Sequence, residues 1–229
     1  MCGRFTLRAP ASVIAEQFSI FEMPEWKARY NIAPSQSVPV VRATEAAAAG
    51  RELVWLRWGL IPGWASDPAI GHRLINARAE SAADKPAFRA AFRRRRCLVV
   101  ADGYYEWRHS GKARQPYLIA MRDGRPFAFA GLWETWEGPQ HSAVESCTIL
   151  TTSANVLVRP LHDRMPVIVN QEDYDLWLDP SVSATEKLSP LLRPYPSQSM
   201  VSHPVSPWVN SPAHDDPRCV EYCHSEGIP

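Results

Sequence analysis

The sequence predicts an α+β fold built mainly on antiparallel sheet, with a few helices interspersed among the strands. Short apolar runs rich in β-branched and aromatic residues recur along the 229-residue chain, and Gly, Pro, Asp and Ser separate them. Helical patterns are few and do not alternate regularly with these runs, which argues against a parallel βαβ sheet. A series of antiparallel strands can close on itself, so we expect a barrel-like arrangement.

Seven runs are predicted to be strands: VPVV near position 40, LVWLRWG from Leu53, CLVVA from Cys97, PYLIAM from Pro116, FAFAGLW from Phe127, CTILTT from Cys147 and PVIV from Pro166. RDGRP at 122–126 is a good hairpin turn between two of them. Three helices are predicted, over 10–18, 86–94 and 170–178. The first two have a proline near their start, and the third has Asn170 as a capping residue followed by an acidic first turn.

The chain shows no internal linker, so we expect a single domain over residues 1–222 and a mobile tail over 223–229. ATEAAAAG at 43–50 is expected to connect two strands at the surface, and the segment from about Tyr195 to be an irregular covering. The formal net charge is only +1, so any binding of nucleic acid must depend on a local patch. Five scattered cysteines, with no signal peptide and no apolar run of membrane-spanning length, favour free thiols in a reducing compartment.

Four positions place reactive groups where chemistry is plausible. Cys2, once Met1 is removed, carries a free α-amine and a thiol on one residue. Glu106 lies between two aromatic residues, which can raise the pKa of a carboxyl. His162 stands beside Asp163, and Asn76 follows an apolar pair. From the residues alone each also has a structural explanation: a disordered terminus for Cys2, a salt bridge for Glu106, a hydrogen-bonded pair for His162 and a turn for Asn76.

Two charged or metal-binding patterns stay open at this level. The run RAAFRRRRC at 89–97 could extend a DNA-binding track or form a solvated helix end. CVEYCH at 219–224 has a Cys-x3-Cys spacing, which is a weak zinc signal. We expect no metal and no cofactor.

Eight motifs occur together in one order: MCGRF at the start, RYNIAP at 29–34, WGLIPGW at 58–64, INARAE at 75–80, ADGYYEW at 101–107, FAGLW at 129–133, TILTTSAN at 148–155 and LHDRMPVIV at 161–169. In this combination the chain resembles the SRAP family, the SOS-response-associated peptidases whose members attach covalently to abasic sites in single-stranded DNA. The resemblance extends from Cys2 to SHPVSPWVN at 202–210.

The resemblance implies that Cys2 becomes the first residue and reacts with the ring-opened aldehyde of an abasic site. The amine forms a Schiff base and the thiol then closes a thiazolidine ring. Glu106 would be the acid/base and take part in removing Met1, Asn76 would hydrogen-bond the sugar or the amine, and His162 would assist proton transfer. The DNA contacts implied by the family are Arg4, Asn31, Pro34, Trp64, Arg78, Thr151 and Arg164; some relatives have a second bulky residue after the tryptophan, where this chain has Ala65.

The expected partner is therefore single-stranded DNA with abasic sites, bound by a monomer in the cytoplasm and at the nucleoid, with replication-fork proteins as further candidates and no membrane. Two other functions stay open: a cysteine peptidase or autopeptidase acting on protein, and a non-covalent reader of modified DNA bases. Strand cleavage in the manner of a lyase also stays open.

Overall fold

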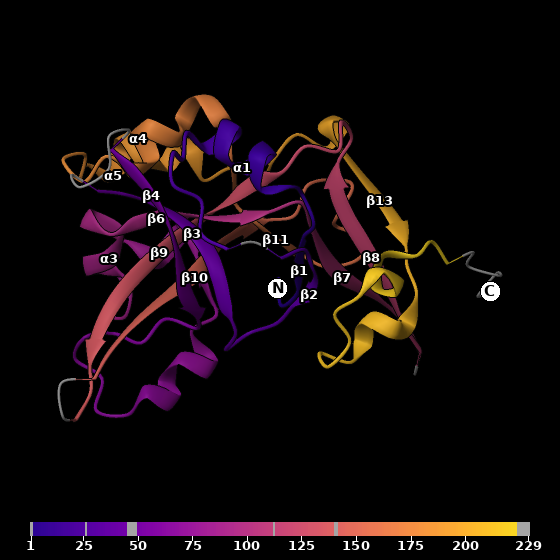
Figure 1. The fold of residues 1–229 in the computed structure, drawn as a ribbon, viewed down its shortest axis with the longest axis horizontal. Coiled ribbons are helices and arrows are strands. Elements are labelled where there is room, and N and C mark those ends of the chain that lie inside the picture. The colour runs from indigo at the N-terminus through magenta and orange to yellow at the C-terminus, as the bar shows by residue number, and fades with distance from the viewer. Residues whose placement is uncertain (1, 26, 45–49, 112, 140–141, 224–229) are drawn as a thin grey trace.

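Two β-sheets form the frame of the protein in the computed structural model, which describes residues 2–25, 27–44, 50–111, 113–139 and 142–223 (Figure 1). The strands are β1 Phe5–Leu7, β2 Arg29–Ile32, β3 Ser37–Ala43, β4 Arg51–Trp58, β5 Asn76–Arg78, β6 Arg96–Ala101, β7 Gly103–Ser110, β8 Ala113–Met121, β9 Phe127–Glu137, β10 Ala143–Ser153, β11 Arg164–Pro166, β12 Ile168–Val169 and β13 Met200–Pro204. The α-helices are α1 Ala11–Phe18, α2 Ala79–Ala82, α3 Arg89–Arg94, α4 Tyr174–Leu178 and α5 Thr185–Leu188.

The larger sheet closes into a barrel. Its strand order is β11-β10-β4-β3-β6-β9-β12, and β10 also pairs with β9, so that β10, β4, β3, β6 and β9 form a ring. All pairs in this ring are antiparallel except β4 with β10, which run parallel. The predicted α+β class with a mainly antiparallel, barrel-like sheet is confirmed.

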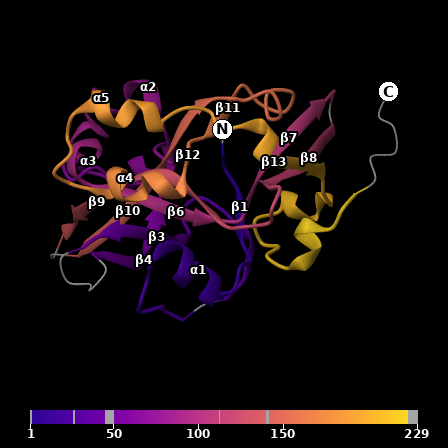
Figure 2. The ribbon, with the colours of Figure 1, turned by 90° about the horizontal axis from the view of Figure 1, so that it is seen from above.

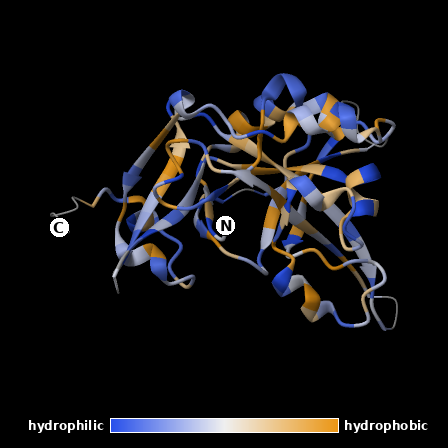
Figure 3. Cartoon of the chain, turned by 180° about the vertical axis from the view of Figure 1, so that it is seen from behind, coloured by the Kyte–Doolittle hydropathy of each residue, from blue (hydrophilic) through white to orange (hydrophobic). Residues whose placement is uncertain are grey.

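The strands of the barrel are apolar and pack closely against one another. Strand β6 is buried along its whole length, and apolar residues are concentrated on the barrel strands (Figure 3). At Gly131 a Cβ atom would lie 2.8 Å from the sulfur of Cys97 and 3.2 Å from the carbonyl oxygen of Thr148. Only glycine therefore fits at this point of β9 without displacing its neighbours.

The smaller sheet has the order β13-β8-β7-β1-β2 and stands beside the barrel, with β1 at the junction (Figures 1 and 2). The ring of Phe5 on β1 packs edge-on against Trp58 and Phe129 of the barrel, at 5.2 and 5.8 Å between ring centres. The residues just before β1 therefore lie between the two sheets, where the candidate site is found.

Helix α1 forms as expected, whereas the other two predicted helices are shorter than the patterns suggested. The second begins at Arg89, because residues 85–88 form a turn in which the amide of Phe88 donates to the carbonyl of Lys85. In the third, a 3-10 turn over Gln171–Asp173 precedes α4, and the side chain of Asn170 does not cap it. The expected capping role of Asn170 is therefore wrong.

The C-terminal segment is more regular than predicted. Strand β13 pairs with β8 from Met200 to Pro204, and two 3-10 turns follow, over Pro207–Asn210 and Pro217–Val220. Of the predicted tail over 223–229, only Cys223 belongs to the described residues. Among the helices of the described part, none has the length and apolar character needed to cross a bilayer.

Candidate functional site

Cys2 lies directly before β1, with its side chain fully buried between the sheets. The side-chain amide of Asn76, at the start of β5, donates to the carbonyl oxygen of Cys2 at 2.8 Å, which fixes the backbone of Cys2. The other side-chain atom of Asn76, Oδ1, is buried and accepts no hydrogen bond from any described residue. It is an acceptor available to a ligand beside Cys2.

Glu106 projects from β7 into the same interior and is 4% exposed. Burial raises the pKa of its carboxyl to about 7, because the charged form loses hydration. Burial likewise raises the pKa of the Cys2 thiol, and the charge of Glu106 raises it further, so the two groups interact. Near neutral pH the carboxyl is present in both forms, as a general acid and base requires.

His162 belongs to the loop between β10 and β11 and is half-buried. The backbone amide of Arg164 donates to its Nδ1 at 2.9 Å. Burial lowers the pKa of His162; the neighbouring Asp163 carboxylate opposes this but is 86% exposed and screened by water, so the neutral imidazole is favoured. Asp163 also raises the pKa of Glu106, which shows that this loop faces the carboxyl.

Arg164 lies at the edge of the site, held by an acidic partner. Its two terminal nitrogens donate to both carboxylate oxygens of Glu80, at 2.7 and 2.8 Å, and one of them also donates to the carbonyl of Thr151. The hydroxyl of Thr151 is buried and donates to Ala77. Glu80 was not predicted as a site residue, and its two oxygens occupy the geometry that a phosphate would take on this guanidinium.

Arg78 lies next to this pair on β5, whose backbone is in register with Thr151 on β10. Its side chain is exposed and makes no hydrogen bond to the described residues. Besides the hydrogen bonds from Arg164, the charge of Arg78 helps to lower the pKa of Glu80, so Arg78 lies near the same carboxylate as Arg164 and is exposed to an anionic ligand there.

Arg4 and Asn31 are instead engaged within the protein. Arg4 donates to Oδ1 of Asn31 at 2.7 Å and to the carbonyl of Val209 at 2.9 Å. The amide of Asn31, which is fully buried, donates to three carbonyls of the segment 209–214. Both side chains therefore hold the C-terminal segment against β1 and β2.

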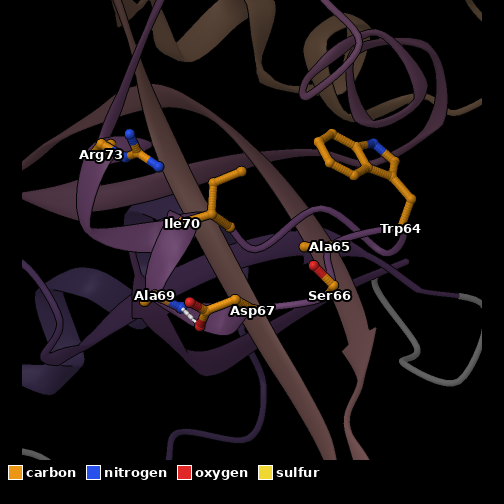
Figure 4. Close-up of a pocket in the computed structure, with 7 residues that line it drawn as sticks. All are labelled: Trp64, Ala65, Ser66, Asp67, Ala69, Ile70 and Arg73. Atoms are coloured by element: carbon orange, nitrogen blue, oxygen red, sulfur yellow. Dashed lines mark hydrogen bonds between the residues drawn. The ribbon is translucent and has the colours of Figure 1, made fainter.

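Pro34 and Trp64 lie in two neighbouring loops. The backbone of Ser35 has a positive φ of 70°. Its hydroxyl is 3.0 Å from Nδ1 of His72, which lies in the 3-10 turn that follows Trp64. Trp64 is 64% exposed and borders a pocket of about 390 Å³, lined also by Ala65, Ser66, Asp67, Ala69, Ile70 and Arg73. Figure 4 shows the indole of Trp64 on one side of this pocket and the guanidinium of Arg73 on the other.

The arginine run at 89–97 divides between two roles. Arg93 and Arg94 are exposed at the end of α3, whereas Arg95 pairs with Glu134 and Arg96 is 2% exposed. Arg96 donates to backbone carbonyls at the ends of α3 and α4, so Arg95 and Arg96, two of the four consecutive arginines, are structural. Cys219 and Cys223 form no disulfide, and no group of three potential metal ligands occurs among the described residues.

Comparison with known proteins places this geometry in a family. The chain is 42% identical over 225 residues to abasic site processing protein YoqW of Bacillus subtilis, covering 96% of this chain and 99% of that protein. It is 31% identical to abasic site processing protein HMCES of Gallus gallus, over 87% of this chain and 69% of that one. A crystal structure of a protein from Bacteroides thetaiotaomicron superposes with a TM-score of 0.86 at 26% identity, covering 97% of this chain and all of that one. The profile described as SOS response associated peptidase (SRAP) matches residues 1–212, and the chain belongs to this family.

Proposed function

We propose that this protein processes abasic sites in single-stranded DNA by attaching to them covalently through Cys2. Relatives named abasic site processing proteins support the target, at 42% and 31% identity. The observation that carries the chemistry is the position of Cys2, whose carbonyl is held by Asn76 beside a carboxyl with a pKa of about 7.

The first bond is formed by the α-amine of Cys2 after Met1 is removed. An α-amine has a pKa of about 7.7–8, so a useful fraction is neutral near pH 7. The amine attacks the C1 aldehyde of the ring-opened sugar, and the resulting carbinolamine loses water to give an imine. Glu106, in its protonated form, donates the proton that lets the oxygen leave as water.

The second bond is formed by the thiol. Burial keeps the Cys2 thiol protonated, which makes the amine the first nucleophile. Glu106, now a carboxylate, accepts the proton of the thiol as sulfur adds to C1, and the imine nitrogen receives a proton. The product is a five-membered thiazolidine that joins nitrogen and sulfur of one residue to one carbon.

Asn76 and His162 assist these steps. The unpartnered Oδ1 of Asn76 can accept a hydrogen bond from the amine or from a sugar hydroxyl, while its amide keeps Cys2 in place. Burial lowers the pKa of His162, which favours the neutral imidazole that can accept a proton from the sugar or from water near the imine.

We propose that Arg78, Arg164 and Thr151 bind the phosphates that flank the lesion, and that Pro34 and Trp64 separate the neighbouring bases. An exposed indole beside a pocket suits stacking on a base, which contributes about 1–3 kcal/mol in single-strand binding. Arg4 and Asn31 support this surface by holding the C-terminal segment. Action on DNA would bring a monomer to the nucleoid, where replication-fork proteins are candidate partners.

The peptidase activity in the family name is best explained as self-processing. We propose that Glu106 also serves the hydrolysis that removes Met1. A buried thiol with a raised pKa is a poor nucleophile for general proteolysis, which needs an accessible thiolate. A lyase reaction at the imine would compete with ring closure by the thiol.

A denaturing gel tests the proposal. Processed protein and a single-stranded oligonucleotide with one abasic site should give a band that survives boiling in detergent. Cys2→Ala should abolish the band, and Cys223→Ala, which removes a partly exposed thiol elsewhere, should leave it unchanged. Salt-sensitive binding without any such band would favour a non-covalent reader of DNA and contradict the proposal.

A further inference from the structure

Tyr104 is a neighbour of the candidate site that the sequence motifs did not single out. It lies on β7 two residues before Glu106, so both side chains point to the same face of the strand. Its backbone is opposite Phe5 of β1, and its ring packs edge-on against Phe129 at 5.9 Å. The side chain is thus held between the two sheets and is fully buried.

The hydroxyl of Tyr104 is buried without a hydrogen-bond partner among the described residues. Such groups are rare, because a buried hydroxyl that loses its contacts with water destabilises the folded state. The next residue shows the usual arrangement, since the hydroxyl of Tyr105 donates to the carbonyl of Tyr30 at 2.7 Å. The fold therefore keeps a polar group at position 104 that packing does not require.

This hydroxyl interacts with the two central groups of the site. Burial raises the pKa of Tyr104 well above its usual value, and the charges of Cys2 and of Glu106 raise it further. Oδ1 of Asn76, which is held against Cys2, is buried and unpartnered as well. A hydrogen-bond donor and an acceptor without partners thus lie near the same reactive residue.

We propose that the hydroxyl of Tyr104 is a further catalytic residue, which donates a hydrogen bond to the C1 oxygen of the abasic sugar while the Cys2 amine attacks. This inference rests on the function proposed above. The aldehyde oxygen gains negative charge as the C–N bond forms, and a positioned donor stabilises that charge. The oxygen then leaves as water with two protons, one passed from the attacking nitrogen through solvent and one from Glu106. The nitrogen loses its second proton to solvent as the C=N bond forms, while Tyr104 keeps its own proton.

Tyr104→Phe tests this role with little risk to the fold, because it removes only an unpartnered oxygen. We expect the melting temperature to be unchanged or higher, and the single-turnover rate of adduct formation to fall about 100-fold, at the lower end of the range for a lost oxyanion donor. Tyr105→Phe is the matched control. It removes a satisfied hydrogen bond on the other face of β7, so it should lower the melting temperature and leave the rate near that of wild type.

Borohydride trapping shows which step is affected. With Tyr104→Phe, imine formation itself should slow, so that little trapped adduct accumulates at early times. Wild-type rates for both imine and final adduct in Tyr104→Phe would overturn the inference, and so would a loss of melting temperature as large as that of Tyr105→Phe.

A non-reacting probe separates this inference from the proposed function. An oligonucleotide whose abasic site is reduced to the ring-opened alcohol retains the C1 oxygen but cannot form an imine. Tyr104→Phe should bind it several-fold more weakly than wild type or Tyr105→Phe. If wild type formed no covalent adduct but Tyr104→Phe still bound the reduced oligonucleotide more weakly, the crosslink would be refuted and the Tyr104 contact supported. Equal affinities of the three proteins for this oligonucleotide would refute the contact.

Discussion

Burial of single ionisable groups determines what the site can do. The carboxyl of Glu106 reaches a pKa of about 7 mainly because it is removed from water, and the thiol of Cys2 is kept neutral for the same reason. The pKa of about 7 lets Glu106 act as both acid and base at neutral pH. Because the Cys2 thiol stays neutral, the amine of Cys2 reacts before the thiol does. Both properties require a fold stable enough to keep these two groups buried, although the charged carboxylate is better hydrated in water.

The raised pKa of Glu106 gives a pH-dependent stability. Below about pH 4.5 the carboxyl is protonated in both the folded and the unfolded chain; between 4.5 and about 7 the unfolded chain releases the proton first, so stability falls as pH rises. Glu106→Gln should therefore exceed wild type in free energy of unfolding by an amount that grows from pH 4.5 to 7, up to about 3 kcal/mol. Urea unfolding across this range measures it, and a difference that does not vary with pH would contradict the assignment. The same variant should lose most of its crosslinking rate.

The contact between Glu80 and Arg164 is a second property at the residue scale. The hydrogen bonds from Arg164 lower the pKa of Glu80, so the carboxylate stays charged and competes with phosphate for the guanidinium. Glu80→Gln should bind undamaged single-stranded DNA several-fold more tightly, with a steeper salt dependence. Fluorescence anisotropy at several salt concentrations measures both. Glu52→Gln, which loosens the pair with Arg42 on the barrel, is the control, and equal tightening in both variants would show that only net charge matters.

At the scale of elements, the barrel strands and a barrel-like sheet were predictable, but the strand pairing that closes the ring was not. Each barrel strand is a run of apolar or β-branched residues, so local sequence identifies it. The parallel pairing of β4 with β10, which closes the ring through Arg57 and Ser146, joins segments far apart in the chain and leaves no local signal. Similarly, the motif that contains Glu106 could be recognised from the sequence. The unpartnered hydroxyl of Tyr104 and the pairing of Arg164 with Glu80 depend on tertiary contacts, so the sequence did not predict them.

The helix ends near the arginine run show the same limit. Four consecutive arginines look alike in sequence, yet Arg96 is buried against carbonyls of two helices while Arg93 is exposed. Hydrogen bonds from a charged group contribute more than neutral ones, so Arg96→Met should lower the free energy of unfolding by about 3 kcal/mol. Arg93→Ala should change it by less than about 0.5 kcal/mol. Comparable values in urea unfolding would mean that Arg96 does not join α3 to α4.

At the scale of the whole molecule, the two sheets share one apolar cluster. Phe5 and Met200 of the smaller sheet belong to the same core as Trp58 and Phe129 of the barrel. We therefore expect residues 2–222 to unfold in one cooperative transition, as the predicted single domain requires. Tryptophan fluorescence and far-UV circular dichroism should give coincident curves. Two separated transitions would mean that the sheets are independent units and that Cys2 lies between domains rather than inside one.

This arrangement gives the site its character, because the reactive residue lies where the two sheets meet. Asn76 comes from the barrel side and Glu106 from the smaller sheet, and both converge on Cys2. A change that shifted one sheet against the other would separate the acid/base from the nucleophile. The chemistry therefore depends on the whole fold and not on one loop.

The intact mass of the purified adduct tests the central claim most directly. The account predicts the sum of the chain without Met1 and the oligonucleotide, minus one water, with no mass gain under borohydride, because a closed thiazolidine has no imine to reduce. A gain of two hydrogens in the wild-type adduct would mean that sulfur does not close the ring. An adduct that retains Met1, or one formed equally by Cys2→Ala, would contradict the account altogether.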